Sequence, residues 1–376
     1  MKRILFCFAL LVGIFCRANA ADYRAVLVAD IDSGHVLYQE HANDLNYPAS
    51  LTKIMTLYLT FDALEHKRLR LDDYLIVSKF ATEAQPVKLG LTAGSKITVE
   101  DAIKAVAVHS ANDVARVLAE NLKGGKEGNF ASLMTRVANE IGLQHTNFEN
   151  SSGLPNDDHM STARDIALLS MAVYKHFPQY WKYFGIKTWT YNGKTYTNTN
   201  RLLGTYPGCD GMKTGFTNKS KYSLVATAKR DGRHLIAVVL GAENKDVRAT
   251  VAAKMLNLGF GKIGVKQTNN NSESSKIHTV SPTQNNPLVK YAQNQNENKN
   301  VAYKSGGTGV QFGAFSTMDA ARKQATRVKD VLGINANIER NDMGLYRVRI
   351  NGISETDATN MKNSAMANGI DCYIFH

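Results

Sequence analysis

The sequence predicts an α+β fold, and the order of its apolar segments is the main reason. An apolar hairpin pattern at 25–39 turns at Asp32-Ser33-Gly34, and a second pair of strands at 222–242 turns at Arg230-Asp231-Gly232. Helical apolar spacing fills the chain between these two strand pairs. We therefore expect one unit whose sheet joins its two ends.

The helices expected in this unit carry apolar residues at i, i+3 and i+4. The segment at 161–177 opens with Ser161 and Thr162, which are favoured N-cap residues. A polar run, Ser110-Ala111-Asn112-Asp113, interrupts the helical pattern at 101–121. The other expected helices run from the turn at Ser50 towards Leu64, over 129–142 and over 249–260.

The first 20 residues, MKRILFCFALLVGIFCRANA, have the composition of a secretory signal cleaved after Ala20. Their apolar core is shorter than the roughly 20 residues that span a bilayer. Removal of this segment leaves two cysteines, Cys209 and Cys372, so no disulfide framework, metal site or cofactor is expected. The mature protein is expected to be exported to the periplasm.

The chain is basic, with a formal net charge of +12 and a pI of about 9.4. Such a charge favours a polyanionic partner. Because export removes nucleic acid as a partner, an anionic polymer of the cell envelope fits this charge better.

A second domain is expected after a tether. Residues 264–306 are rich in Asn, Gln and Ser and poor in apolar residues, which predicts a flexible linker after a first domain at 21–263. Residues 307–376 then show a β-α-β-β-α-β order, typical of a small ferredoxin-like sheet. No apolar segment that could anchor the mature chain in a membrane is evident.

Three short motifs of the first domain carry chemistry together. They are Ser50-x-x-Lys53, Ser110-x-Asn112 and Lys213-Thr214-Gly215, and each of them alone would be a weak signal. Ser50 and Lys53 lie one helical turn apart, so a lysine of lowered pKa could activate the serine hydroxyl. Burial and the charge of Lys213 would lower that pKa.

The other motif residues have compatible roles. Ser110 could relay a proton to the leaving amine, and Asn112 could hold Lys53 and a substrate amide. Lys213 and Thr214 would face a substrate carboxylate, while Gly215 lets a peptide lie along the strand edge. The expected oxyanion donors are the backbone amides of Ser50 and Phe216.

Residues 22–263 resemble the D-alanyl-D-alanine carboxypeptidases, which are low-molecular-mass penicillin-binding proteins. The blocks YPASLTKIMT, HSANDVA, SSGLPNDDHMSTARDIALL and GMKTGFTNKSKYSLVATAKRDGRHLIAVVLGA carry the likeness. The resemblance implies a penicillin-binding, serine β-lactamase-like domain with an antiparallel sheet flanked by helices. It also implies a serine acyl-enzyme that removes the terminal D-Ala from peptidoglycan pentapeptide stems and is acylated by β-lactams. Arg248 would then anchor the substrate's terminal carboxylate.

Residues 307–376 resemble the SPOR family through VQFGAFSTMDAARKQATRV and GLYRVRINGIS. That likeness implies binding to peptidoglycan glycan strands stripped of stem peptides, which are enriched at the division septum. The candidate glycan-binding residues are Gln311, Phe312, Tyr346 and Arg347. Because alternate strand residues face opposite sides, we expect at least half of them, Phe312 first, to be core residues.

Three other functions remain open at this point. A DD-endopeptidase that cleaves crosslinks would use the same residues. A class A serine β-lactamase would need a Glu-x-x-Leu-Asn loop, and no such pattern occurs between 140 and 180. A septal peptidoglycan-binding protein would depend mainly on the second domain.

Overall fold

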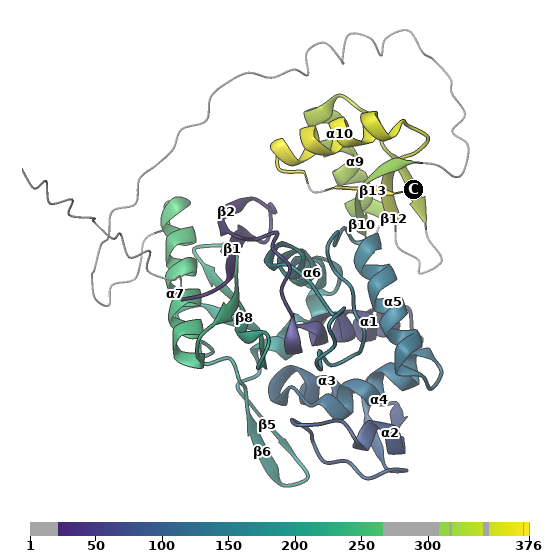
Figure 1. The fold of residues 1–376 in the computed structure, drawn as a ribbon, viewed down its shortest axis with the longest axis vertical. Coiled ribbons are helices and arrows are strands. Elements are labelled where there is room, and N and C mark those ends of the chain that lie inside the picture. Colours follow the sequence, from purple (N-terminus) through teal and green to yellow (C-terminus); the bar gives the residue numbers. More distant parts are fainter. Residues whose placement is uncertain (1–21, 266–307, 316–317, 341–345, 371, 376) are drawn as a thin grey trace, which may run out of the picture.

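The computed structural model describes two folded parts of the chain (Figure 1). The described residues are 22–265, 308–315, 318–340, 346–370 and 372–375. The expected signal at 1–20 and nearly all of the expected linker at 264–306 lie outside them. In the part of the chain that the structure describes, no helix is long and apolar enough to cross a membrane.

The first part is built around a five-stranded antiparallel sheet. Its strand order is β2 (Val36–Glu40), β1 (Ala25–Asp30), β9 (Arg233–Ala242), β8 (Lys221–Arg230) and β7 (Cys209–Thr217). Strand β1 pairs with β9, with Val28 opposite Ala237, so the sheet joins the two ends of this unit as the sequence predicts. Strand β7 forms one edge of the sheet.

Helices cover both faces of this sheet, in an α+β arrangement (Figure 1). One core contains Ala25, Leu27 and Ala29 of β1, and the other contains the alternate residues Val26 and Val28. The larger core packs under α1 (Lys53–Glu65), α3 (Val99–Lys104), α4 (Asn112–Lys123), α5 (Glu127–Glu140) and α6 (Ala163–His176). The smaller core packs under α7 (Lys245–Lys262), which begins four residues before the expected helix at 249–260.

Helix α1 is the central helix of the domain. Every residue from Lys53 to Leu64 is buried, so the helix is covered on all sides rather than on one face. Lys53 is its first residue and is carried into the interior with the apolar side chains. The ammonium group of Lys53 therefore depends on protein partners rather than on water.

Several short elements are not predicted by the sequence pattern. Two small hairpins pair β3 (Tyr74–Ile76) with β4 (Lys96–Thr98), and β5 (Thr188–Tyr191) with β6 (Lys194–Thr197). Short helical segments are α2 (Lys79–Thr82), the 3-10 turns η1 (Ala49–Thr52) and η3 (Pro178–Gly185), and the π-helical η2 (Ala105–His109). These pieces are too short to show a clear apolar period.

The second part has the predicted β-α-β-β-α-β order. Its elements are β10 (Gly309–Phe315), α9 (Met318–Leu332), β11 (Asn337–Arg340), β12 (Tyr346–Ile350), α10 (Glu355–Ala367) and β13 (Tyr373–Phe375). The antiparallel strand order is β11-β12-β10-β13. A separate core that includes Val310, Phe312 and Val348 fills the space between the sheet and the two helices.

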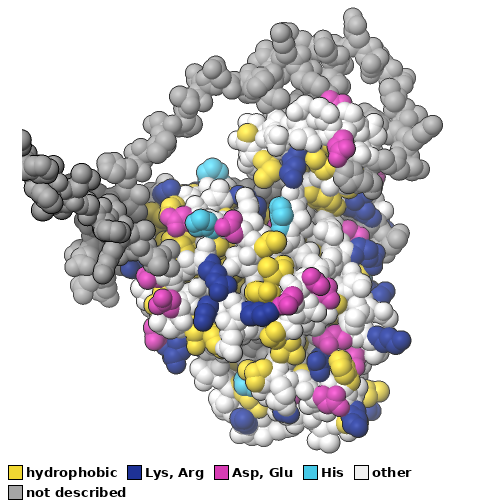
Figure 2. Space-filling model, in the orientation of Figure 1, with side chains coloured by type: hydrophobic (Ala, Val, Ile, Leu, Met, Phe, Trp, Pro, Cys, Tyr) yellow, Lys and Arg dark blue, Asp and Glu magenta, His cyan; other side chains and the backbone are white. Residues whose placement is uncertain are grey.

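Charged side chains are mixed on the face of the molecule seen in Figure 2. Lys and Arg lie among Asp and Glu rather than in one continuous basic patch. On this face the positive side chains do not mark a single docking site.

Candidate active site

Ser50 lies in the turn η1, directly before the central helix α1. The preceding residue, Ala49, has a φ of 49°, a left-handed conformation that is uncommon for a residue with a side chain. Strand β7 passes close to this turn: a Cβ placed on Gly215 would lie 3.0 Å from the carbonyl oxygen of Pro48 and 3.3 Å from the amide nitrogen of Ser50. A side chain at 215 would therefore crowd the turn that carries Ser50. The sequence predicts a close backbone approach at Gly215, but by a substrate peptide along the strand edge.

Lys53 Nζ lies 2.8 Å from Ser50 Oγ, and the residue is fully buried. Two acceptors surround the same nitrogen, Asn112 Oδ1 at 2.7 Å and the carbonyl oxygen of Ser152 at 2.6 Å. Burial, together with the positive charge of Lys213, lowers the pKa of Lys53 well below its usual value. In its neutral form the Lys53 amine has two N–H groups for Asn112 and Ser152 and one lone pair, which can accept the hydroxyl proton of Ser50.

Asn112 is held in a fixed orientation at the start of α4. Its Nδ2 donates to the carbonyl oxygen of Gln85 at 2.8 Å, which turns Oδ1 towards Lys53. The next residue, Asp113, accepts from the amides of Leu89 and Gly90, both at 2.9 Å. The loop between α2 and β4 is thereby tied to the helix that carries Asn112.

Ser110 accepts a hydrogen bond from the second lysine of the site, Lys213. It has a φ of 66° and lies between η2 and α4, where the polar run interrupts the predicted helix. Lys213 Nζ lies 2.8 Å from Ser110 Oγ and 3.1 Å from the carbonyl oxygen of Thr214. Burial and the nearby guanidinium of Arg248 lower the pKa of Lys213 to about 7.

The outer edge of β7 borders the site. Thr214 is buried and its hydroxyl lies 2.7 Å from that of Thr199. Phe216, in contrast, is 47% exposed and its ring lies 4.3 Å from that of Tyr222. Because β7 pairs only with β8 in its sheet, a peptide could add to its free edge as a further strand.

Arg248 lies in the first turn of α7 and is only 6% exposed. One of its guanidinium nitrogens donates to the carbonyl oxygen of Ser223 at 3.4 Å, and its Nε has no partner among the described residues. A buried guanidinium with unused donors is suited to an anionic ligand.

Sequence reasoning missed a second layer of residues behind Ser50 and Lys53. Glu127 accepts from the amide of Ser151 at 3.0 Å and pairs with Arg116 at 3.2 Å. His159 Nε2 lies 2.8 Å from the hydroxyl of Thr52, and burial lowers the pKa of His159 to about 4, so it is neutral there. The block SSGLPNDDH is visible in the sequence, but its contact with Lys53 is made by a backbone carbonyl, which carries no residue-type signal.

The glycan-binding candidates divide between the two faces of the second sheet. Phe312 is 1% exposed and belongs to the core, and Tyr346 packs at the edge of that core. Gln311 lies on the opposite face, opposite Arg349 in the strand register, and Arg347 is two residues from Arg349 on the same strand. Phe312 is therefore withdrawn as a candidate contact, because its ring fills the space between the sheet and the helices. Gln311 is also fully buried, with its side chain bonded to Arg349 and to the carbonyl oxygen of Glu140 in the first domain.

The geometry defines a class of protein: serine acyl-transfer enzymes in which a buried lysine, rather than a histidine, activates the nucleophile. Among the described residues, no group of three or more His, Cys, Asp or Glu side chains converges as a metal site would need. Residues 16–244 match peptidase family S11, D-alanyl-D-alanine carboxypeptidase, and the chain belongs to this family. Residues 304–375 match the SPOR domain.

Known relatives agree with this assignment. The chain is 34% identical over 248 residues to the D-alanyl-D-alanine carboxypeptidase DacF of Bacillus subtilis, covering 65% of this chain and 63% of the relative. It is 38% identical over 250 residues to DacC of Escherichia coli, covering 65% and 62%. The chain thus spans slightly less than two thirds of the length of these relatives. Penicillin-binding protein D2 of Listeria monocytogenes, solved in its ampicillin-bound form, superposes with a TM-score of 0.59 and 32% identity over 64% of this chain and 98% of that one.

Proposed function

We propose that this protein is a serine-type D-Ala-D-Ala carboxypeptidase of the periplasm, which removes the terminal D-Ala from peptidoglycan pentapeptide stems. The observation that carries the proposal is the contact of 2.8 Å between Ser50 Oγ and the buried Nζ of Lys53, whose two N–H groups have other acceptors. Family membership supplies the reaction class, and this contact supplies the means of activating the nucleophile.

In the proposed reaction, Ser50 Oγ attacks the carbonyl carbon of the penultimate D-Ala while Lys53 takes its proton. The backbone amides of Ser50 and Phe216 stabilise the oxyanion. The C–N bond breaks, and the proton that Lys53 took passes through Ser110 to the leaving amine of the terminal D-Ala; Ser110 itself is held by Lys213 Nζ at 2.8 Å. A water molecule then attacks the acyl ester while the neutral Lys53 takes its proton. The bond to Ser50 Oγ breaks, the tetrapeptide stem leaves as the acid, and Lys53 returns the proton to Ser50.

The substrate carboxylate would lie near Lys213, Thr214 and Arg248. Lys213 and Arg248 are both buried, and a buried positive charge is costly unless an anion joins it. β-Lactams carry a carboxylate and a reactive carbonyl in a similar arrangement, so we expect them to acylate Ser50.

A DD-endopeptidase would use the same residues on a crosslinked stem. The edge of β7 would accept either substrate, because the two differ in the bulk of the leaving group beyond the scissile bond. A β-lactamase is disfavoured because Glu127, the buried carboxylate behind Ser151, is already paired with Arg116 and Ser151 rather than free to activate water.

The test incubates residues 21–376 with pentapeptide monomers in one set and crosslinked muropeptide dimers in another, and follows D-Ala release by mass spectrometry. Loss of one D-Ala from monomers alone supports the carboxypeptidase. Cleavage of dimers would make the endopeptidase the main activity. Ser50→Ala is the control, and robust penicillin labelling of that variant would overturn the assignment of the nucleophile.

We also propose that the SPOR domain holds the enzyme on peptide-free glycan strands at the division septum. Tethering a catalytic domain to its polymer raises the effective concentration of stems around it. Removing 307–376 should spare activity on a small peptide and weaken binding to sacculi. Unchanged binding to sacculi would rule out this role, and a cellular phenotype that survives Ser50→Ala would make wall binding the main function.

A further inference from the structure

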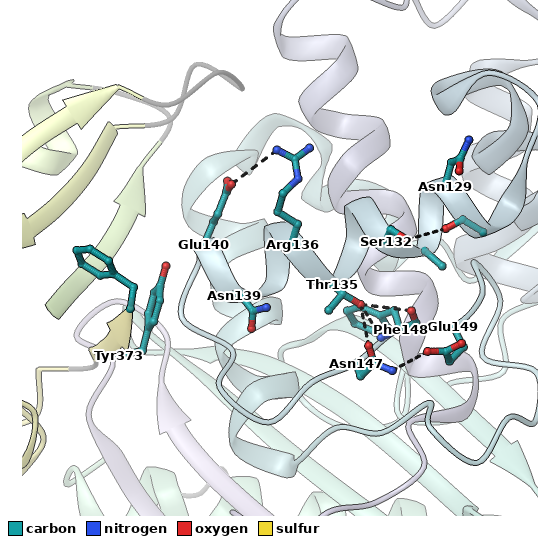
Figure 3. Close-up of a pocket in the computed structure, with 13 residues that line it drawn as sticks. Asn129, Ser132, Thr135, Arg136, Asn139, Glu140, Asn147, Phe148, Glu149 and Tyr373 are labelled. Atoms are coloured by element: carbon teal, nitrogen blue, oxygen red, sulfur yellow. Dashed lines mark hydrogen bonds and ion pairs between the residues drawn. The ribbon is translucent and has the colours of Figure 1, made fainter. Parts of the chain in front are cut away.

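A groove of about 850 Å³ lies between the catalytic domain and the SPOR domain (Figure 3). Helix α5 and the loop at 147–149 form one side of it, and Tyr373 and Phe375 of β13 form the other. The groove is separate from the residues around Ser50. No role in the proposed reaction uses any of the side chains that line it.

Helix α5 presents a polar stripe to this groove. Asn129, Ser132, Arg136 and Asn139 are exposed at spacings of three, four and three residues, so they share one face of the helix. Within the described part of the chain, the amide side chains of Asn129 and Asn139 make no hydrogen bond to another residue. Arg136 is half exposed, and its only ion pair there is a long one of 4.0 Å to Glu140. The stripe therefore offers amide donors and acceptors and a guanidinium to a ligand.

The SPOR side of the groove offers aromatic rings. Tyr373 and Phe375 are two residues apart on β13, so both lie on the sheet face away from the domain's helices. The guanidinium of Arg349, on strand β12, lies 4.3 Å from the centre of the Phe375 ring and packs over it. Flat rings beside hydrogen-bonding groups are suited to a sugar, whose C–H faces pack on aromatics while its polar groups are bonded from the sides.

Contacts between the domains hold the two sides of the groove together. Gln311 Nε2 donates to the carbonyl oxygen of Glu140, at the end of α5. Lys362 Nζ donates to Gln144 Oε1 at 2.7 Å. Tyr373 packs close to Gly142, because a Cβ placed on Gly142 would lie 4.0 Å from the Tyr373 ring. Because these contacts lie at the Glu140 end of α5, the Tyr373 ring lies beyond that end of the polar stripe (Figure 3).

We propose that this groove is a saccharide-binding site shared by the two domains, and that its occupant is a peptide-free strand of N-acetylated amino sugars. This inference rests on the proposed wall-binding function, and it adds the α5 face of the catalytic domain as a second half of the site. Amide side chains match acetamido groups, and Arg136 matches the lactyl carboxylate that a sugar exposes once its stem peptide is removed.

Helix α5 connects such a site with the residues around Lys53. The helix has 14 residues, so it is about 21 Å long. Glu127 at its first turn holds Ser151, whose neighbour Ser152 bonds Lys53, while Glu140 at its last turn holds Gln311 of the SPOR domain. A strand bound along α5 therefore extends from the SPOR sheet towards the end of the helix that supports the catalytic site.

The test measures binding of residues 21–376 to fluorescently labelled peptide-free glycan strands, prepared from sacculi with an amidase. We expect the double variant Arg136→Ala/Asn139→Ala to bind these strands about tenfold or more weakly than the wild type, because it removes a charge-assisted hydrogen bond and an amide contact. The matched control is Lys254→Ala, which removes one exposed positive charge from α7, outside the groove, and should stay within about twofold of the wild type.

A second probe separates the carboxylate from the rest of the sugar. A hexamer of N-acetylglucosamine has the same acetamido groups but no lactyl carboxylate, so Arg136→Gln should weaken binding of the strands and leave the hexamer unchanged. Equal loss for both probes would overturn the role given to Arg136. Thermal unfolding of each variant checks that it is folded.

The outcomes separate this inference from the functions on which it depends. If the wild type binds strands and the double variant binds them equally well, the shared groove is wrong while wall binding by the SPOR domain stands. If the wild type binds neither probe, both the wall-binding function and the saccharide site in the groove are wrong. Absence of D-Ala release would overturn the carboxypeptidase alone.

Discussion

The carbonyl oxygen of Ser152 lies 2.6 Å from Lys53 Nζ, and the next residue, Gly153, packs directly against the turn that carries Ser50. A Cβ on Gly153 would lie 1.8 Å from the carbonyl oxygen of Ala49, and its φ is 81°. Asn150 Oδ1 accepts from the amide of Gly153 at 2.7 Å and fixes this arrangement. One short turn therefore positions both Ser50 and Lys53, the proposed nucleophile and base.

Gly153→Ala should lower the rate of Ser50 acylation at least about tenfold, since even a displacement of 1 Å can cost more than that. The added methyl group must move either the Ala49 carbonyl or the Ser152 carbonyl. The measurement is the second-order rate of labelling with a fluorescent penicillin. The matched control is Gly125→Ala, at a φ of 85° with open space around the position. It should cost stability of about 1 kcal/mol and leave acylation unchanged. Equal acylation by both variants would contradict the proposed contact.

Lys53→Met should slow acylation by about 10²–10⁴-fold, because the methionine keeps the buried volume of the lysine but removes the general base. In the wild type, acylation should fall as the pH is lowered, since protonation of Lys53 removes its lone pair. The pKa of Lys53 lies well below that of an ordinary lysine, so this fall should occur well below pH 10. A pH profile of the acylation rate checks both points. A rate that rises only near pH 10 would show that Lys53 is an ordinary lysine.

The free energy of unfolding should increase with pH between about 7 and about 10, because the pKa of Lys213 is lowered in the folded protein. Its pKa is lowered to about 7 in the folded protein, whereas lysine in an unfolded chain titrates near 10.4. Between these values the unfolded chain binds more protons, so the free energy of unfolding increases with pH. Lys213→Met should show a flatter dependence of Tm on pH over this window than the wild type. If the two proteins had parallel curves of Tm against pH, the pKa of Lys213 would not be lowered in the folded protein.

Arg248→Gln should weaken turnover of peptides with a free terminal carboxylate by about 10–100-fold, a loss of about 1.4–3 kcal/mol of charge-assisted hydrogen bonding. A peptide amide, which lacks this carboxylate, should be turned over equally by the variant and the wild type. The folded protein should be no less stable, because the substitution removes a buried cation whose Nε has no partner among the described residues. The ratio of kcat/KM for acid and amide substrates is the measurement. A ratio unchanged by the substitution would place the carboxylate elsewhere.

The sequence predicted the order of the main elements of both domains. The hairpin at 25–39, the interrupted helix at 101–121 and the β-α-β-β-α-β order after 307 appear in the structure close to their expected places. These segments are long enough for the apolar period to be read, and their turns carry Gly, Asp or Asn. The short hairpins at 74–98 and 188–197 have no such period and were not predicted.

The sequence by itself determined which chemical groups the catalytic domain carries, because a serine, two lysines and an asparagine are recognisable by type and spacing. Only the tertiary structure decided how they act on one another. Three features show this, and each depends on residues far apart in the chain. The Ser152 carbonyl lies against Lys53 Nζ, burial lowers the pKa of Lys213, and Gly153 packs against Ala49. A sequence pattern reports residue types, so it carries no signal for the position of a backbone carbonyl or for the burial of a side chain. Both are set by how the chain packs around the central helix α1.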